Sequence, residues 1–255
     1  MTREYGMEIR YFKHYSGCLG RDMEFKVYGH RGKPVMFIPC QVGRFYDFEN
    51  FHMIDTWAKW IENGQVMVFS IDVIDGETYA DRGGDPRRRI EQHERWYHYV
   101  VDELVPYIRH LAGERNWHDE PIMTFGASMG SMHAANLFFR RPDLFGSVLA
   151  LSGLYDSEGF FGNYMDELLY QNTPCRYLEG MPHDHPYIGM YNRRKMVFCV
   201  GQGAWEDELK ASTAHLKQIL DRKGIHAQVD FWGHDVSHDW PWWFRQCDYY
   251  VPQMI

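Results

Sequence analysis

The chain has 255 residues, of which 45% are hydrophobic and 24% charged, a composition typical of a folded globular protein and not of a disordered or fibrous chain. Its 27 Lys and Arg residues and 35 Asp and Glu residues give a formal charge of −8, which argues against nucleic acid as a partner. No segment approaches the roughly 20 apolar residues of a membrane span, so no membrane association is expected.

The cysteines and the first residues of the sequence indicate a compartment. Five scattered cysteines form no Cys-x-x-Cys pair, which is typical of free thiols under reducing conditions. The first residues contain no apolar segment of a secretory signal. Together these features predict a cytoplasmic protein. The aromatic content of 16% is compatible with an aromatic-rich core, with an aromatic substrate cleft, or with the interface of a homo-oligomer.

Predicted strands and helices alternate along most of the chain. Residues 7–15 and 23–29 are expected to form an antiparallel hairpin. The strands predicted after it are 34–38, 66–71, 121–125, 147–151, 196–200 and 227–232. The helices predicted between them are 50–62, a long helix that begins at Pro86, 129–139, 208–222 and a last helix from about Trp240. This alternation predicts a single α/β domain over 1–255, with a mostly parallel eight-stranded sheet and helices on both faces.

Residues 154–194 interrupt the alternation. They are rich in Gly, Pro, Tyr and His and show no clear helix or strand pattern. These 41 residues are too many for a simple connection in a compact domain. We therefore expect an insertion that covers the active site or builds its pocket.

The sequence Gly126-Ala127-Ser128-Met129-Gly130 follows a predicted strand and precedes a predicted helix. A serine on such a sharp turn has a strained backbone that exposes its hydroxyl above the sheet. Side chains two residues before and after the serine would collide with neighbouring elements, which explains the two glycines. The N-terminus of the following helix also favours negative charge at this place. Ser128 is therefore the predicted nucleophile.

A serine hydroxyl needs a base, and in this fold the chain order is nucleophile, acid, histidine. Among the 14 histidines, His238 lies in the loop after the last predicted strand and before the last helix, where the base is expected. His234 is closer to the strand and is the alternative. The acid is expected after the strand 196–200, where Glu206 and Asp207 are both candidates. Asp207 is preferred because of its shorter side chain, although an Asp at a helix start is also a common N-cap.

Two backbone N–H groups are expected to form the oxyanion hole. One belongs to Met129, directly after the nucleophile, and the other to the loop after the strand 34–38. In that loop Gln41 is the first choice and Cys40 the alternative.

Three motifs of this chain resemble the putative-esterase family of α/β-hydrolases. They are the elbow 126–130, the acid loop GQGAWEDEL at 201–209 and the ending HDWPWW at 238–243. The family includes S-formylglutathione hydrolases, feruloyl esterases and mycolyltransferases, and the resemblance covers essentially the whole chain. It implies that His238 is the base. The family's pattern of an acid, any residue and then Phe or Leu matches 207–209 and implies that Asp207 is the acid.

The predicted function is therefore hydrolysis of a small or aromatic acyl ester through an acyl-enzyme on Ser128. The alternatives are acyl transfer by the same triad and a non-catalytic binding protein with this fold. No cofactor and no metal are expected. His183, Asp184 and His185 lack further ligands at a telling spacing, and Asp72, Asp75 and Glu77 are interpreted as polar residues at a strand end. The expected partner is a small-molecule ester.

Overall fold

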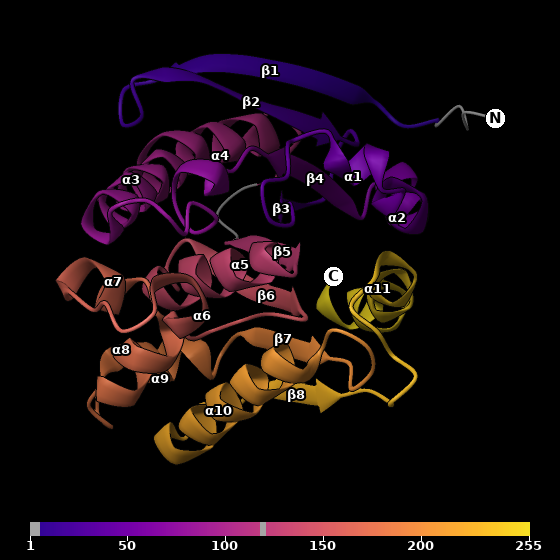
Figure 1. The fold of residues 1–255 in the computed structure, drawn as a ribbon. Coiled ribbons are helices and arrows are strands. Elements are labelled where there is room, and N and C mark those ends of the chain that lie inside the picture. The colour runs from indigo at the N-terminus through magenta and orange to yellow at the C-terminus, as the bar shows by residue number, and fades with distance from the viewer. Residues whose placement is uncertain (1–5, 118–120) are drawn as a thin grey trace.

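A mixed sheet forms the centre of the molecule in the computed structural model, which describes residues 6–117 and 121–255 (Figure 1). Its strands, in chain order, are β1 (Ile9–Ser16), β2 (Arg21–Tyr28), β3 (Lys33–Ile38), β4 (Val66–Ile71), β5 (Ile122–Ala127), β6 (Phe145–Leu151), β7 (Lys195–Val200) and β8 (Gln228–Phe231). Their order across the sheet is β1-β2-β4-β3-β5-β6-β7-β8. The β1/β2 and β2/β4 pairs are antiparallel, and all other pairs are parallel. The predicted eight-stranded, mostly parallel sheet is confirmed.

The inner strands are apolar along their whole length because both faces of the sheet are covered. In β3, Val35 and Phe37 enter one hydrophobic cluster, whereas Met36 and Ile38 enter the cluster on the other face. This alternation follows from the two-residue period of a strand. Strands that are buried on both faces have continuous apolar sequences, and for this reason the sequence revealed them.

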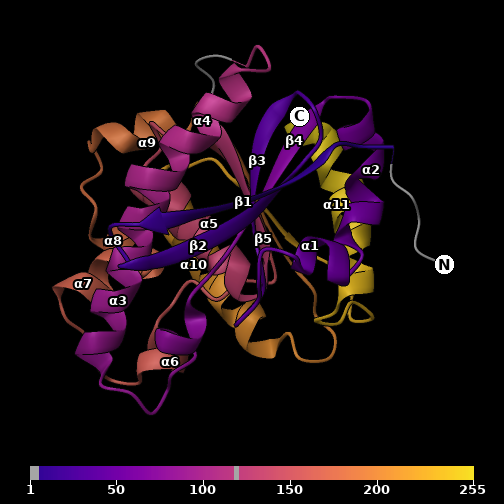
Figure 2. The ribbon, with the colours of Figure 1, turned by 90° about the horizontal axis from the view of Figure 1, so that it is seen from above.

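Helices cover both faces of the sheet (Figure 2). One face carries α1 (Asp47–Asn50), α2 (Met53–Glu62) and α11 (Trp240–Met254). The opposite face carries α3 (Pro86–His98), α4 (Val105–Gly113), α5 (Met129–Arg140) and α10 (Asp207–Lys223). Within the described ranges, no helix combines the length and the apolar character that a membrane span needs.

The long helix predicted from Pro86 is divided by a π-helical segment. Between α3 and α4 lies η2 (Tyr99–Leu104), in which the helix is wider than an α-helix. Pro106 follows directly in the first turn of α4. Proline has no N–H and its ring collides with the carbonyl four residues earlier, so a local widening accommodates it.

Residues 154–194 form short helices instead of an open loop. These are α6 (Glu158–Phe161), α7 (Glu167–Gln171), α8 (Pro174–Gly180) and α9 (Pro186–Tyr191). The later helices pack beside α5 and α10; the Tyr191 hydroxyl, for example, donates to the Phe139 carbonyl at 2.6 Å. The first part of the insertion faces the site, because Leu154 and Phe160 line a cavity next to Ser128. Of the expected insertion, this first part contributes residues to the pocket.

Candidate active site

Ser128 lies at the turn between β5 and α5, with φ of 55° and ψ of −129°. A positive φ is rare for a residue with a side chain, and such strain is concentrated at functional sites. The Ser128 N–H donates to the carbonyl of Leu151 on the neighbouring strand β6 at 2.9 Å, which holds the turn against the sheet. The predicted elbow is therefore present.

The two glycines of the elbow permit close backbone contacts. A Cβ atom on Gly126 would lie 2.3 Å from the backbone of Gly130, and a Cβ on Gly130 would lie 2.2 Å from the carbonyl oxygen of Ile38. Both distances are far too short for carbon atoms. The second contact also brings the start of α5 against the end of β3, which places the loop after β3 beside Ser128.

His238 lies in the loop between β8 and α11, as the sequence predicts. Its Nε2 is 2.9 Å from Ser128 Oγ. Its backbone N–H donates to the Ala204 carbonyl at 3.0 Å, and its ring packs edge-on against Trp243 at 5.0 Å. The alternative base, His234, is exposed on the same loop. Of these two candidates, the structure brings His238 to Ser128.

The carboxylate beside His238 belongs to Glu206 and not to Asp207. Glu206 Oε2 lies 3.4 Å from His238 Nδ1, and the Glu206 side chain is 1% exposed. The Asp207 side chain is 89% exposed and pairs with Lys210 at 3.3 Å. The structure therefore does not bring the preferred candidate, Asp207, to His238 and places the alternative, Glu206, there instead.

The local backbone explains this difference. Trp205 has φ of 67°, and this left-handed residue turns the chain so that Glu206 faces the interior while α10 begins at Asp207. The first residue of the helix then points to solvent. The acid loop is also bound to the histidine loop, because the Gly203 N–H donates to the Val236 carbonyl at 2.8 Å.

Ser152 is a second partner of Glu206 that the sequence did not reveal. Its hydroxyl donates to Glu206 Oε1 at 2.6 Å and accepts from Trp243 Nε1 at 3.2 Å. Trp243 belongs to the HDWPWW ending, so this motif supplies both the histidine and the donor that holds Ser152, the partner of Glu206. Ser152 follows β6 without any recognisable motif, and its role appears only when the strands are assembled.

The loop after β3 contains the two candidates for the second oxyanion donor. Gln41 lines the cavity next to Ser128. Cys40 instead packs against the hydrophobic cluster under α2 and α11, and burial raises the pKa of its thiol to about 12. Met129, the first residue of α5, has an N–H that no carbonyl within the helix can accept. The structure thus places Gln41 at the cavity and the Cys40 side chain against the core.

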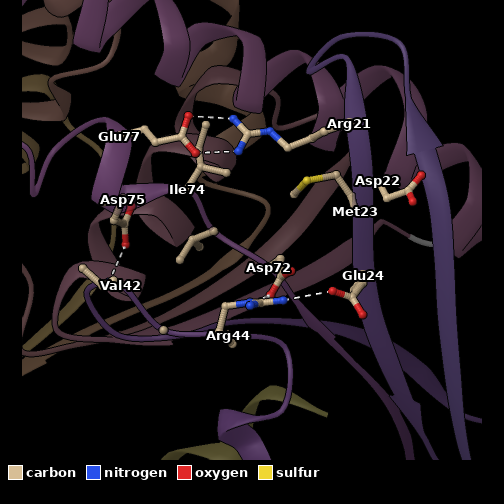
Figure 3. Close-up of a pocket in the computed structure, with 13 residues that line it drawn as sticks. Arg21, Asp22, Met23, Glu24, Val42, Arg44, Asp72, Ile74, Asp75 and Glu77 are labelled. Atoms are coloured by element: carbon tan, nitrogen blue, oxygen red, sulfur yellow. Dashed lines mark hydrogen bonds and ion pairs between the residues drawn. The ribbon is translucent and has the colours of Figure 1, made fainter.

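A buried carboxylate ties this loop to the nucleophile helix. Asp75, in the 3₁₀ turn η1 (Asp75–Glu77), accepts the Val42 N–H at Oδ2 with a distance of 3.3 Å (Figure 3). Its Oδ1 lies 2.9 Å from His133 Nε2 on α5. Val42 has φ of 58°, which is strained for a β-branched residue. Neither Asp75 nor His133 was predicted as a site residue from the sequence.

The cavity next to Ser128 is small, with a volume of about 120 Å³. Five apolar side chains line it, together with Gln41, Arg82, Ser128 and His238. Small-molecule sites commonly have about 300–1,000 Å³, so this space accommodates a short group.

A second hollow, of about 300 Å³, is lined by residues of β2, of the loop after β3 and of the segment after β4 (Figure 3). Its arginines are paired with carboxylates, since Arg21 binds Glu77 through two contacts and Arg44 binds Asp72 at 2.9 Å. Asp72, Asp75 and Glu77 thus each have a protein partner, in keeping with their interpretation as polar residues at a strand end.

Potential metal ligands lie elsewhere. His183 and Asp184 are exposed, and His185 caps α9 by accepting the Tyr187 N–H at 3.1 Å. In the described ranges, Asp156, Cys175 and His215 bring ligand atoms within 4.8 Å of one another. Asp156 already accepts from Ser212 at 2.9 Å and contacts His215 Nδ1 at 3.1 Å. Burial raises the pKa of the Cys175 thiol, which disfavours the thiolate that a metal requires.

The sheet is mostly parallel and carries a serine on a strand–helix elbow. A histidine contacts the serine hydroxyl, and a buried carboxylate contacts the histidine. These features define an α/β-hydrolase-fold protein. The model of the putative-esterase family matches residues 16–249, and the chain belongs to this family. It is a carboxylic ester hydrolase.

Solved structures with the same fold are similar over nearly the whole chain. A ferulic acid esterase has 16% identity and a TM-score of 0.73, with 98% of each chain covered. Fluorophosphonate-binding serine hydrolase F of Staphylococcus aureus has 14% identity and a TM-score of 0.72, covering 97% of this chain and 98% of its own. An S-formylglutathione hydrolase of Agrobacterium tumefaciens has 16% identity and a TM-score of 0.68, covering 99% and 94%. Comparison with curated proteins gave no match.

Proposed function

We propose that the chain hydrolyses esters of short carboxylic acids through an acyl-enzyme on Ser128, with His238 as the base and Glu206 as the acid. The observation that supports this proposal is the continuous contact from Ser128 Oγ to His238 Nε2 at 2.9 Å and from His238 Nδ1 to Glu206 at 3.4 Å. A base within hydrogen-bonding distance of a nucleophile, itself oriented by a third group, is the arrangement that activates a serine.

In the first half of the reaction, Ser128 Oγ attacks the ester carbonyl carbon while His238 Nε2 takes the hydroxyl proton. The tetrahedral intermediate then expels the alcohol oxygen, which receives that proton from His238. Glu206 accepts the Nδ1–H, so that Nε2 is left as the acceptor, and it stabilises the charged imidazolium. The products of this half are the free alcohol and an ester of Ser128.

In the second half, water replaces the alcohol. His238 takes a proton from the water as its oxygen attacks the acyl carbon, and returns the proton to Ser128 Oγ when the bond to the enzyme breaks. One ester and one water become one acid and one alcohol, and the enzyme is regenerated.

The negative oxygen of each intermediate would be bound by the N–H groups of Met129 and Gln41. Asp75 supports the second of these donors. It holds the N–H of the next residue, Val42, at 3.3 Å and is itself held by His133 on α5. The loop and the nucleophile helix are thus linked by one buried side chain.

The size of the cavity supports a short acyl group. A volume of about 120 Å³ is below the usual range of small-molecule sites, and its apolar walls suit an acetyl or propionyl chain better than a hydroxycinnamoyl group. In a series of p-nitrophenyl esters, kcat/KM should be highest for acetate or propionate and should fall by octanoate.

A fluorophosphonate probe and p-nitrophenyl acetate test the proposal together. The wild type should be labelled at Ser128 and should turn over the ester; Ser128→Ala should lose labelling and about 10⁶-fold in kcat. Ser237→Ala, which removes a hydroxyl next to His238, should be labelled like the wild type. Unchanged turnover by Ser128→Ala, or a wild type that neither reacts with the probe nor cleaves any ester, would contradict the proposal.

A further inference from the structure

Arg82 is the one permanently charged residue among those that line the cavity beside Ser128. None of the described residues that line this space carries a carboxylate. The protein as a whole carries a formal charge of −8, so this lining residue has the opposite sign to the net charge of the molecule. A local cation in an acidic protein attracts anions to the place where it lies.

The guanidinium of Arg82 forms no ion pair with any residue in 6–117 or 121–255. It lies over the ring of Phe160 at 5.4 Å, and Phe160 lines the same cavity. Arg21 and Arg44, which belong to the neighbouring hollow, are neutralised by carboxylates (Figure 3). The donors of Arg82 therefore remain available to a ligand, whereas those of the other two are occupied.

The segment that carries Arg82 is fixed by a buried arginine. Arg89, at the start of α3, donates to the carbonyls of Thr78 at 2.8 Å, Tyr79 at 3.0 Å and Phe160 at 3.0 Å. One side chain thus holds both the turn before Arg82 and the residue on which Arg82 stacks. Positioning of this kind on a rigid support is what a specificity group requires.

We propose that Arg82 binds a carboxylate of the substrate, so that the preferred substrates are small esters that carry a carboxylate on the acyl or the alcohol side. This inference rests on the hydrolysis proposed above. A guanidinium binds a carboxylate through two parallel hydrogen bonds. A single guanidinium balances one negative charge, which suits a carboxylate better than a phosphate monoester with its charge of about −1.5 to −2.

Two matched pairs of esters test the inference. Monomethyl succinate is compared with methyl 4-methylpentanoate, in which an isopropyl group replaces the carboxylate, and hydrolysis is followed by pH-stat. 4-Acetoxybenzoate is compared with 4-isopropylphenyl acetate in the same way on the alcohol side. The quantity measured is the ratio of kcat/KM for the anionic ester to kcat/KM for its neutral partner.

In Arg82→Gln, this ratio should fall about 10- to 100-fold for at least one pair, the usual range for a lost hydrogen bond to a charged group. In Arg82→Lys the ratio should fall less, because the positive charge is kept. For the wild type, 0.5 M salt should lower the ratio because it screens the charge. Arg88→Gln, which removes an exposed charge outside the cavity, should keep it. Equal slowing of anionic and neutral esters by Arg82→Gln, or unchanged ratios for both pairs, would overturn the inference while leaving the hydrolysis intact. A wild type inactive on all four esters, or activity retained by Ser128→Ala, would overturn both.

Discussion

Two buried carboxylates, each in contact with a histidine, lie on the two sides of Ser128 along the sheet. Glu206 follows β7 and contacts His238 at 3.4 Å, while Asp75 follows β4 and contacts His133 at 2.9 Å. The strand that carries Ser128 lies between these two strands in the sheet order. The pairs are alike in chemistry and differ in what surrounds the imidazole.

The surroundings separate the two pairs in function. His238 is 20% exposed and directs Nε2 at Ser128, so it can exchange a proton with a substrate. His133 is 1% exposed and is enclosed by the rings of His93, Trp96 and Tyr79 at 5.1, 5.2 and 5.5 Å. An imidazole closed off in this way cannot reach a substrate, but it can hold a carboxylate in place. We therefore expect the first pair to govern proton transfer and the second to govern the shape of the oxyanion loop.

The largest loss of activity should come from a substitution in the Glu206–His238 pair. Glu206→Gln keeps the size of the side chain but removes the charge that orients His238 and stabilises its protonated form. We expect kcat for p-nitrophenyl acetate to fall about 10³- to 10⁴-fold, as loss of the third member of a catalytic triad does.

Asp207→Asn is the matched control, because it neutralises the next carboxylate in the chain. The Asp207 side chain is 89% exposed and its pairing with Lys210 is on the surface, so kcat should stay within about twofold of the wild type. The reverse outcome, with Asp207→Asn inactive and Glu206→Gln active, would restore the preference drawn from the sequence.

The residues on the proton-transfer side of Ser128 differ in how well the sequence predicts them. The elbow around Ser128 was predictable because five consecutive residues and the elements beside them define it. His238 followed from chain order and the tryptophan-rich ending. Choosing between Glu206 and Asp207 required the direction of two adjacent side chains, which the left-handed backbone of Trp205 decides. A spacing pattern contains no information about such a turn.

The contacts on the other side of Ser128 could not be predicted from the sequence, for a different reason. Val42, Asp75 and His133 come from three separate segments, and 58 positions separate Asp75 from His133. No local pattern relates residues that meet only after the sheet has formed. Asp75 could be interpreted from the sequence only as a polar residue at a strand end, and His133 lies among the buried, mostly apolar residues of α5, where no pattern distinguishes it.

A smaller effect should come from Asp75, which acts through the loop and not on the substrate. Asp75→Ala removes the acceptor of the Val42 N–H and the partner of His133. Loss of an oxyanion donor costs about 10²–10³-fold in kcat, so misplacement of that donor should cost about 10- to 100-fold, with little change in KM. Asp75→Asn keeps one acceptor oxygen and should recover part of the loss.

The control for Asp75 is Glu77→Gln, two residues further along the same turn. Glu77 is half exposed, and its carboxylate contacts Arg21 and Gln92 instead of the Val42 N–H, so kcat of this variant should match the wild type. If Asp75→Ala lowers kcat no more than Glu77→Gln does, the link between Asp75 and the oxyanion hole is absent.

The burial of His93 beside His133 should also make the stability of the protein sensitive to acid. His93 stacks on His133, and burial, followed by the charges of His133 and Arg140, lowers the pKa of His93 well below the ordinary histidine value. Below about pH 6.5 the unfolded chain therefore binds a proton at this position that the folded chain does not, and the free energy of unfolding falls as the pH falls. Urea unfolding should show a loss of about 1 kcal/mol between pH 7 and 5.5 that is absent in His93→Gln. His183→Gln, which removes an exposed histidine, should keep the wild-type pH dependence. The same slope in His93→Gln as in the wild type would mean that the enclosed histidines do not set the acid sensitivity.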